Sequence, residues 1–413
     1  MRHYRRAIPI EHLRHHPNFV PLPPASTIQK LESMEDARFF RQDSWQWDAL
    51  HDGRCTTSQA VAALGFLEPQ AGKFLGVPRS WQHGGMGAYR RLRKPAIRTL
   101  HEMNARLCVG NNTSLEDNMV QTLNDKNNSM IWSIPKKPPA GKTTKKPYPF
   151  VAKYLIKTSE EDRQRRKTLT QKYSRNNSFG VAVRCMWGDA QEATALLTAL
   201  NFFCGQDPNV LLKEVGMCGA GMGCPKNQSI QSNLIVGATP DALICYPNGT
   251  IEVLEVKNHC PFVANSRGYQ ARASFVKRFS IRTMNFHQVG VPPHYIPQLM
   301  MEMLCVGPEC QSAIMVRQSA TSGAVIMRIH RDDQWIEEML YWLHRFQNEF
   351  VEKESPPPPD FFWETGTGGD RARYRRFLEK TKELEAKVTI LTRIANPNIQ
   401  RSTGQRSFDP FLD

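Results

Sequence analysis

Three charged residues between positions 241 and 257 have types and spacing suited to binding a metal ion. Asp241 follows Pro240 directly, and Glu255 and Lys257 stand two positions apart in the run IEVLEVK. Side chains alternate along a strand, so Glu255 and Lys257 share one face. Charges on a buried face need partners, because an unpaired buried charge is strongly unfavourable. A Mg²⁺ ion held by Asp241 and Glu255 would supply one, since Mg²⁺ takes one or two protein carboxylates together with waters and phosphate oxygens.

Such a cation would support hydrolysis of a phosphodiester. It polarises the phosphodiester and lowers the pKa of a bound water, and Lys257 is placed to steer or deprotonate that water. Glu192, on an otherwise apolar stretch, would complete a second metal site or hold a water. The alternatives are a surface Glu255–Lys257 ion pair with Asp241 in a turn, and a solvated Glu192.

The strands that carry these residues must form a hairpin. DALICY and IEVLEVK are short β-branched runs joined by Pro-Asn-Gly-Thr, and Asn248-Gly249 favours a tight turn. A strict two-residue turn pairs residue 241 with 256 and points Asp241 away from Glu255. We therefore expect a bulge, a kink at Pro240 or a longer turn.

The remaining elements between 180 and 350 follow from hydrophobic periodicity. The pattern predicts a helix over about 186–203, a further strand in SNLIVGAT, a helix from near Pro297, a strand pair in SAIMVRQ and AVIMRIH, and a closing helix from Asp332 and Asp333. This order predicts an α/β or α+β fold, with a central mixed sheet flanked by helices.

Composition points to a polyanionic partner. The 413 residues carry a net charge of +15, of which a net +10 lies between Lys136 and Arg175. Forty per cent of the residues are apolar, and no apolar run is long enough for a transmembrane helix. The ten cysteines include no C-x-x-C pair, so neither a zinc ribbon nor a disulfide framework is indicated. We expect a soluble intracellular protein with no membrane association.

Breaks in pattern divide the chain. We predict an N-terminal extension (1–40), the first part of the main domain (41–107), a polar and basic insertion (108–178), the main core (179–352), a Pro/Gly-rich linker (353–370), and a C-terminal helix with a tail (371–413). The insertion is read as a disordered surface segment, a phosphate-contacting arm or a nuclear-localisation signal. The C-terminal helix, with Leu384, Val388 and Leu391 on one face, would pack on the body or on a partner.

The candidate residues lie in segments that resemble a known family. The chain resembles the lambda-exonuclease, or YqaJ-like viral recombinase, group of PD-(D/E)XK nucleases. The motifs that carry the resemblance are Pro240-Asp241, Glu255-Val256-Lys257 with Cys260-Pro261-Phe262, WDALHDGRCTTSQA from Trp47, WGDAQE ending at Glu192, and YIPQLMMEM from Tyr295. They fall in family order and cover roughly residues 44–67 and 180–350.

The resemblance implies a restriction-endonuclease-like core and a Mg²⁺- or Mn²⁺-dependent DNA exonuclease that resects duplex ends from 5′ to 3′ in recombination or repair. It also implies a ring-shaped homotrimer and a single-strand-annealing partner protein. Its functional residues map here onto catalytic Asp241, Glu255, Lys257 and Glu192, metal ligands Asp241, Glu255 and Val256, and DNA- or phosphate-binding Arg54, Ser58, His51 and Gln298.

Two departures keep other functions open. His51 stands where the family has its first arginine, and Met300 replaces the second glutamine of the family's helix. A structure-specific endonuclease and a non-catalytic DNA-binding accessory protein remain alternatives. From the residues alone, Arg54 and Ser58 are four apart and would hold a phosphate from one side of a helical turn. The alternative is a helix cap at Thr56 or Thr57 with Arg54 in solvent.

Overall fold

The computed structural model describes residues 8, 10–42, 44–77, 84–112, 179–222, 230–264, 279–281, 290–364 and 369–395. Beyond residue 112, the predicted basic insertion lies outside the described residues. Within the described part, no helix is both long enough and apolar enough to span a bilayer. No disulfide joins any of the cysteines described there.

The described part of the chain begins mainly with helices and then combines strands and helices from α10 onward. The α-helices are α1 (Ile10–Arg14), α2 (Trp45–Ala49), α3 (Thr57–Ala63), α4 (Pro69–Phe74), α5 (Met86–Leu92), α6 (Leu100–Asn112), α10 (Phe179–Cys204), α12 (Ile296–Val306), α13 (Asp333–Phe346), α14 (Phe361–Glu364) and α15 (Gly369–Ala386). The strands are β1 (Phe19–Val20), β2 (Leu211–Lys213), β3 (Ala242–Cys245), β4 (Ile251–His259), β5 (Phe262–Ala264), β6 (Phe279–Ile281), β7 (Cys310–Ser319), β8 (Gly323–His330) and β9 (Thr389–Ile394).

Seven of these strands form one mixed sheet in the order β1-β2-β3-β4-β7-β8-β9. The pairs β1–β2 and β4–β7 are parallel, and the other neighbours are antiparallel. Strands β5 and β6 make a separate two-stranded sheet. The predicted mixed sheet flanked by helices is therefore confirmed, whereas its assignment to the PD-(D/E)XK type stays a prediction.

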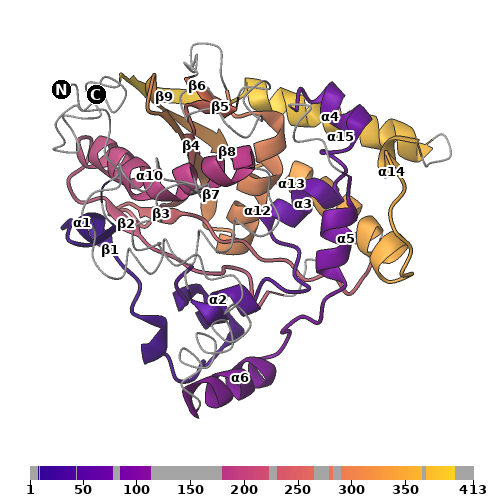
Figure 1. Cartoon of the computed structure of the whole chain (residues 1–413), viewed down its shortest axis with the longest axis horizontal. Helices are drawn as coiled ribbons and strands as arrows, with labels where there is room; N and C mark the ends of the chain where they lie inside the picture. The colour runs from indigo at the N-terminus through magenta and orange to yellow at the C-terminus, as the bar shows by residue number, and fades with distance from the viewer. Residues whose placement is uncertain are drawn as a thin grey trace, which may run out of the picture.

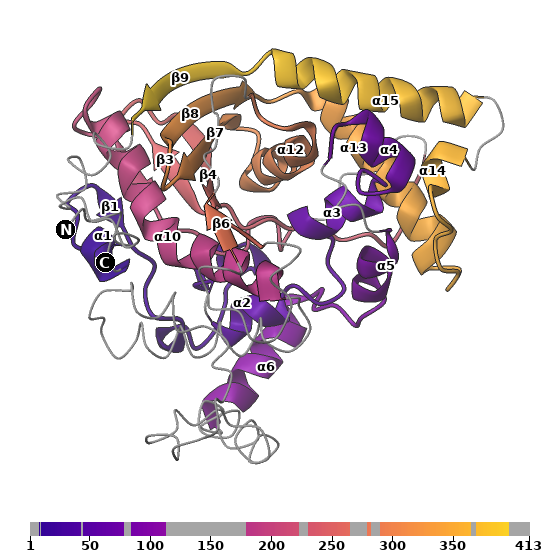
Figure 2. The ribbon, with the colours of Figure 1, turned by 45° about the horizontal axis from the view of Figure 1, so that its top comes forward.

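Helices cover both faces of the sheet, and alternate residues of β4 point to different layers. Leu254 and Val256 pack in the cluster that includes Leu196 and Leu200 of α10. Val253 instead packs in the cluster formed with α12 and α13. Figures 1 and 2 show α10 on one side of the sheet and α12 and α13 on the other. Because both faces are covered, every charged residue in the middle of β4 is buried or half-buried.

The hairpin between β3 and β4 has a longer turn, which is one of the three departures from a two-residue turn that we expected. Cys245 pairs with Ile251 and Ala242 with Leu254, so three residues, 247–249, lie between the last opposed positions 246 and 250. The amide of Tyr246 donates to the carbonyl of Thr250. Gly249 has a φ of 86°, a left-handed conformation that glycine adopts without strain. This register, continued by one residue, places Asp241 opposite Glu255.

Three further predicted elements around the sheet are confirmed. Helix α12 carries Pro297 in its first turn, β7 and β8 form the second hairpin, and α13 is capped by the Asp332 side chain, which accepts from the amide of Trp335 at 2.9 Å. Helix α10 covers the predicted 186–203 and begins earlier, at Phe179.

Two predicted elements differ from the structure. SNLIVGAT forms only single bridges, Cys55 to Val236 and Cys218 to Ala238, because its neighbours are short irregular segments rather than strands. The C-terminal helix ends at Ala386, and Leu391 lies on β9, which pairs with β8 at the sheet edge. Val388 and Leu391 therefore do not continue the helical face of Leu384, and the β-branched run TILTRI instead extends the sheet.

The segments predicted as extension, linker and tail contribute to the main cores. Leu13 and Phe19 pack in the cluster under α10. Phe361, inside the predicted linker, and Phe377 on α15 pack in the cluster under α12. In Figure 2, α15 runs along the top of the molecule and leads into β9. The described parts of these segments are thus integral to the fold.

Candidate active site

Asp241, Glu255 and Lys257 meet on the face of the sheet covered by α12. Their strand neighbours show this, since Leu243 and Val253 pack toward α12, whereas Ala242, Leu254 and Val256 pack toward α10. Side chains alternate, so Asp241 shares the face of Leu243, and Glu255 and Lys257 share the face of Val253. Asp241 and Glu255 are therefore on the same face of this hairpin, as a shared site requires.

Glu255 and Lys257 form an ion pair in which Lys257 Nζ donates to Glu255 Oε1. Glu255 is only 3% exposed, and its second oxygen, Oε2, is buried without a hydrogen-bond partner. The Lys257 ammonium also lies over the Tyr295 ring, 5.3 Å from its centroid. Burial is the largest influence on Lys257 and lowers its pKa, but the charges of Glu255, Tyr295 and Asp241 and the hydrogen bond to Glu255 together raise the pKa above its ordinary value. Lys257 is therefore a cation in this arrangement, suited to electrostatic stabilisation rather than to proton abstraction.

Asp241 lies at the start of β3, where its Oδ2 accepts a hydrogen bond of 2.7 Å from the amide of Val256. Burial raises its pKa well above the ordinary value, and the charges of Glu255 and then Glu192 raise it further. Glu192 is half-buried on α10, and its effect on Asp241 places the two carboxylates near one another. The side chain of Val256 is buried toward α10, so only its backbone is available to a cation.

A fourth carboxylate, Glu302, joins this group from α12. Its side chain is fully buried, Oε1 accepts a 2.9 Å hydrogen bond from Gln298 Nε2, and Oε2 has no partner. Burial raises the pKa of Glu302, and the charge of Glu255 raises it further. Glu302 was not among the site residues predicted from the sequence. The signal was present, because Glu302 is the single acidic residue in the otherwise apolar run IPQLMMEMLCV.

The chemistry of these donors fits a hard divalent cation. Carboxylate oxygens are the ligands that Mg²⁺ prefers, and Glu255 and Glu302 each hold a buried oxygen that lacks a partner. Among the described residues, no group of three or more acidic, histidine or cysteine side chains is arranged, as it stands, to hold a metal ion. In this structure the ammonium of Lys257, rather than a metal ion, neutralises the carboxylate of Glu255.

Arg54 does not join a phosphate site on helix α3. It precedes the helix, is 1% exposed, and donates to the carbonyl oxygens of Leu50, Val236 and Ile97 at 3.1, 2.8 and 3.1 Å. Burial lowers its pKa to about 10, which leaves it a cation at neutral pH. Both expectations for Arg54, phosphate contact and solvent exposure, are at odds with this position. Its guanidinium instead ties the segment before α3 to residues leading toward Asp241.

Ser58 and His51 lie in the same N-terminal segment but contact different residues. His51 Nδ1 lies 2.8 Å from the carbonyl oxygen of Trp47, and its ring packs edge-on against the Trp47 ring. The Trp47 indole in turn donates to Thr239, two residues before Asp241. Ser58 is exposed on α3, and its hydroxyl donates to Gln59.

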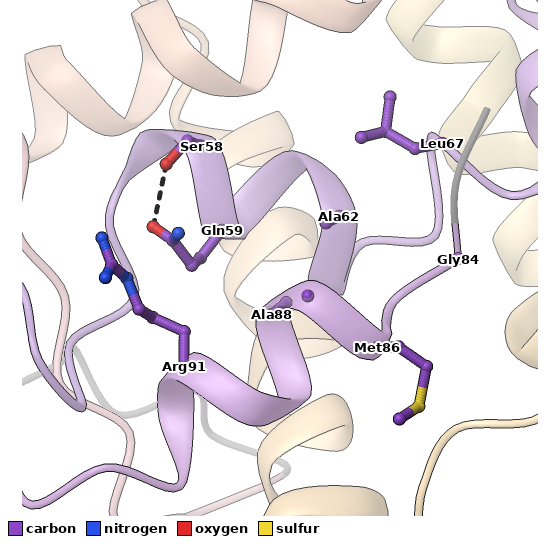
Figure 3. Close-up of a pocket in the computed structure, with 9 residues that line it drawn as sticks. Ser58, Gln59, Ala62, Leu67, Gly84, Met86, Ala88 and Arg91 are labelled. Carbon is purple, nitrogen blue, oxygen red and sulfur yellow. Dashed lines mark hydrogen bonds between the residues drawn. The ribbon is translucent and has the colours of Figure 1, made fainter. Parts of the chain in front are cut away.

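Ser58 lines a hollow of about 480 Å³ between α3 and α5. Figure 3 shows Ser58 and Gln59 on one wall and Arg91 on the other, with mostly apolar or glycine residues between them. The Arg91 guanidinium is 3.9 Å from Asp52 and remains partly exposed. Helix α3 packs on α12, which carries Gln298 and Glu302. One wall of the hollow is therefore a helix that packs on α12, the helix that carries Glu302.

Comparison with known proteins gives one weak structural match. The crystal structure of an alkaline exonuclease (LHK-Exo) from Laribacter hongkongensis matches at 18% identity and a TM-score of 0.25, over 49% of this chain and 86% of that chain. No family model and no curated protein matches the chain. Similarity this low establishes no shared activity, so a functional assignment depends on the site itself.

Proposed function

We propose that this protein is a metal-dependent DNA nuclease whose active site is formed by Asp241, Glu255 and Lys257. One observation carries the proposal: three charged side chains, spaced as in the sequence motif, share one buried sheet face with a partnerless Glu255 oxygen among them. Buried polar atoms in stable cores usually have hydrogen-bond partners, so an oxygen without one beside two further charged groups favours a ligand at this position.

In this proposal, different residues bind the metal and stabilise the phosphate. Asp241 and Glu255, with Glu192 nearby and the backbone of Val256, would hold Mg²⁺ or Mn²⁺. The cation, when bound, supplies Lewis acidity toward the phosphodiester. The Lys257 ammonium stabilises negative charge that develops on the phosphate, because it lies in a water-poor site with a raised pKa. The net charge of +15 attracts the DNA backbone.

The finer assignment is a 5′-to-3′ exonuclease on duplex ends that acts in recombination or repair. It draws on the motif resemblance, which also suggests Ser58, His51 and Gln298 as DNA contacts, a homotrimer, a single-strand-annealing partner, and action in the nucleus or at viral or organellar DNA. Ser58 borders a hollow that Arg91 also lines, an arrangement suited to an anionic group.

The test uses purified full-length protein with linear and closed circular duplexes, each with Mg²⁺, with Mn²⁺ and with chelator. The proposal expects metal-dependent loss of the linear duplex and survival of the closed circle. Cutting of the circle would instead identify an endonuclease. No cleavage of either DNA with either metal would contradict the proposed chemistry and favour a non-catalytic DNA-binding protein.

A further inference from the structure

Glu302 is a buried carboxylate whose surroundings do not satisfy it. Only one of its oxygens, Oε1, has a hydrogen bond, which comes from Gln298 one helical turn earlier. The other, Oε2, is buried and has no partner, and the residue is 0% exposed. A carboxylate in such a position is unfavourable unless a proton or a cation compensates it.

Glu302 faces the carboxylates of the candidate active site. Helix α12 packs on β4 and β7, over the face that carries Glu255 and Lys257. Glu255 is the charge that acts most strongly on Glu302, and Lys257 and Asp241 act on it as well. Helix α12 therefore places Glu302 over the sheet face that carries Glu255 and Lys257.

A second observation concerns Glu255 itself. Its Oε2 is buried and without a partner, while its Oε1 is held by the ammonium of Lys257. Two carboxylate oxygens without partners thus come from neighbouring elements, and Lys257 neutralises only one carboxylate. With Asp241 and Glu192 the group contains four carboxylates, which a divalent cation compensates better than a single ammonium.

We infer that Glu302 is an additional carboxylate of the divalent-cation site, which binds the cation through Oε2 together with Asp241 and Glu255. The inference rests on the proposed function, because it requires that this site binds a cation. Gln298 is then a positioning residue: its amide holds Oε1, and Oε2 is left without a partner and available to the cation. This role differs from the DNA contact expected for Gln298 from its motif.

The experiment measures Mn²⁺ binding by full-length protein without DNA, using calorimetry, for the wild type, Glu302→Gln and Asp241→Asn. Glu302→Gln should weaken Mn²⁺ binding at least tenfold, because it removes an anionic ligand while preserving the side-chain shape. Glu309→Gln, an exposed residue just beyond α12, is the matched control and should bind as the wild type does. Thermal unfolding provides a second readout, in which Mn²⁺ should raise the Tm of Glu302→Gln less than that of the wild type.

The outcomes separate the inference from the proposed function. Wild-type affinity in Glu302→Gln, with weakened binding in Asp241→Asn, would overturn the role of Glu302 and leave the nuclease proposal standing. Absence of Mn²⁺ binding and of cleavage in the wild type would overturn both. Should Glu302→Gln not fold, Gln298→Leu retains the carboxylate but releases its Oε1, and a several-fold loss of Mn²⁺ affinity is expected. Unchanged affinity in that variant would contradict the inference.

Discussion

At the scale of single residues, the site is a group of carboxylates that disfavour one another's ionisation. Burial and the charges of Glu255 and Glu192 raise the pKa of Asp241, and burial and Glu255 raise that of Glu302. The pKa of Lys257 is raised as well, and for a lysine this favours the charged ammonium. Binding a cation must displace protons from these carboxyls, so affinity for the metal should increase with pH.

The first prediction concerns pH and the metal-free protein. A carboxyl whose folded pKa is raised binds more protons when folded than when unfolded, so its contribution to stability is lost as pH rises. This loss begins above the ordinary carboxyl pKa of about 4. Asp241→Asn removes the titrating group, so its Tm relative to the wild type should increase between pH 5 and pH 8. Thermal melts in chelator check this, and a Tm difference that does not change with pH would contradict the assigned repulsion.

The second prediction separates structure from DNA contact at Arg54. Arg54→Met leaves three carbonyl oxygens without their donor, so it should reduce the free energy of unfolding by about 3 kcal/mol or more. Ser58→Ala, on the exposed face of α3, should leave stability unchanged and weaken DNA binding. Urea unfolding and DNA titration of folded protein measure the two effects. An Arg54→Met protein as stable as the wild type but deficient in DNA binding would reverse our assignment.

At the scale of elements, the β3–β4 turn decides whether the carboxylates meet. The alternating pattern predicted both strands, and the Pro-Asn-Gly-Thr sequence predicted a turn between them. The length of the turn could not be predicted from the sequence. It matters because one added residue moves every side chain of one strand to the other face. The choice of a three-residue connection depends on the packing of β3 against α10 and α12, which is tertiary information.

The same limit explains the other differences. SNLIVGAT has strand composition but no adjacent strand long enough to pair with it, and TILTRI becomes a strand because the edge of β8 is available. Available pairing partners decide both cases: strand propensity is not realised in SNLIVGAT and is realised in TILTRI. Glu302 was not predicted because the family motif in this helix includes the positions of Gln298 and Met300 but not that of Glu302. An acidic residue on a buried, mostly apolar helix is nevertheless a signal in its own right.

The third prediction tests the turn. Gly249→Val places a β-branched residue at a φ of 86° and should cost about 1–2 kcal/mol. Gly249→Asn, which tolerates the left-handed region, is the matched control and should cost less. Both variants keep the strand residues, so DNA cleavage should persist below the unfolding transition. Equal stability of the two variants in chemical denaturation would show that the turn does not impose this conformation in solution.

At the scale of the whole molecule, a mixed sheet is covered on both faces and extended at both edges by segments from the chain's two ends. β1 lies at one edge and β9 at the other. Tyr374 on α15 donates from its hydroxyl to the carbonyl of Leu64 at 2.7 Å, and Phe377 packs 5.0 Å from the Trp335 ring. The Pro/Gly-rich residues 353–370 were predicted to be a linker. The helix that follows them is packed on the main domain, because Tyr374 and Phe377 are buried.

The fourth prediction follows from this packing. Phe377→Ala removes a side chain that is 1% exposed and should reduce the free energy of unfolding by about 3–5 kcal/mol. Arg376→Ala, its exposed neighbour, should have little effect. Equilibrium unfolding of both full-length variants provides the comparison. If the two were equally stable, α15 would not be docked on the body as described.

The central claim is that Glu255 and its neighbours carry out metal-dependent DNA hydrolysis, and one measurement tests it most directly. Cleavage of a linear duplex with excess enzyme and Mg²⁺ is compared for the wild type, Glu255→Gln and Glu252→Gln. Glu252 is equally buried on β4 but faces the other way and pairs with Arg328. We expect Glu255→Gln to cut at least about 100-fold more slowly while still binding DNA, since each ~1.36 kcal/mol of lost transition-state stabilisation is tenfold in rate. Folded Glu252→Gln should cleave as the wild type does, and near-normal cleavage by Glu255→Gln would contradict the account.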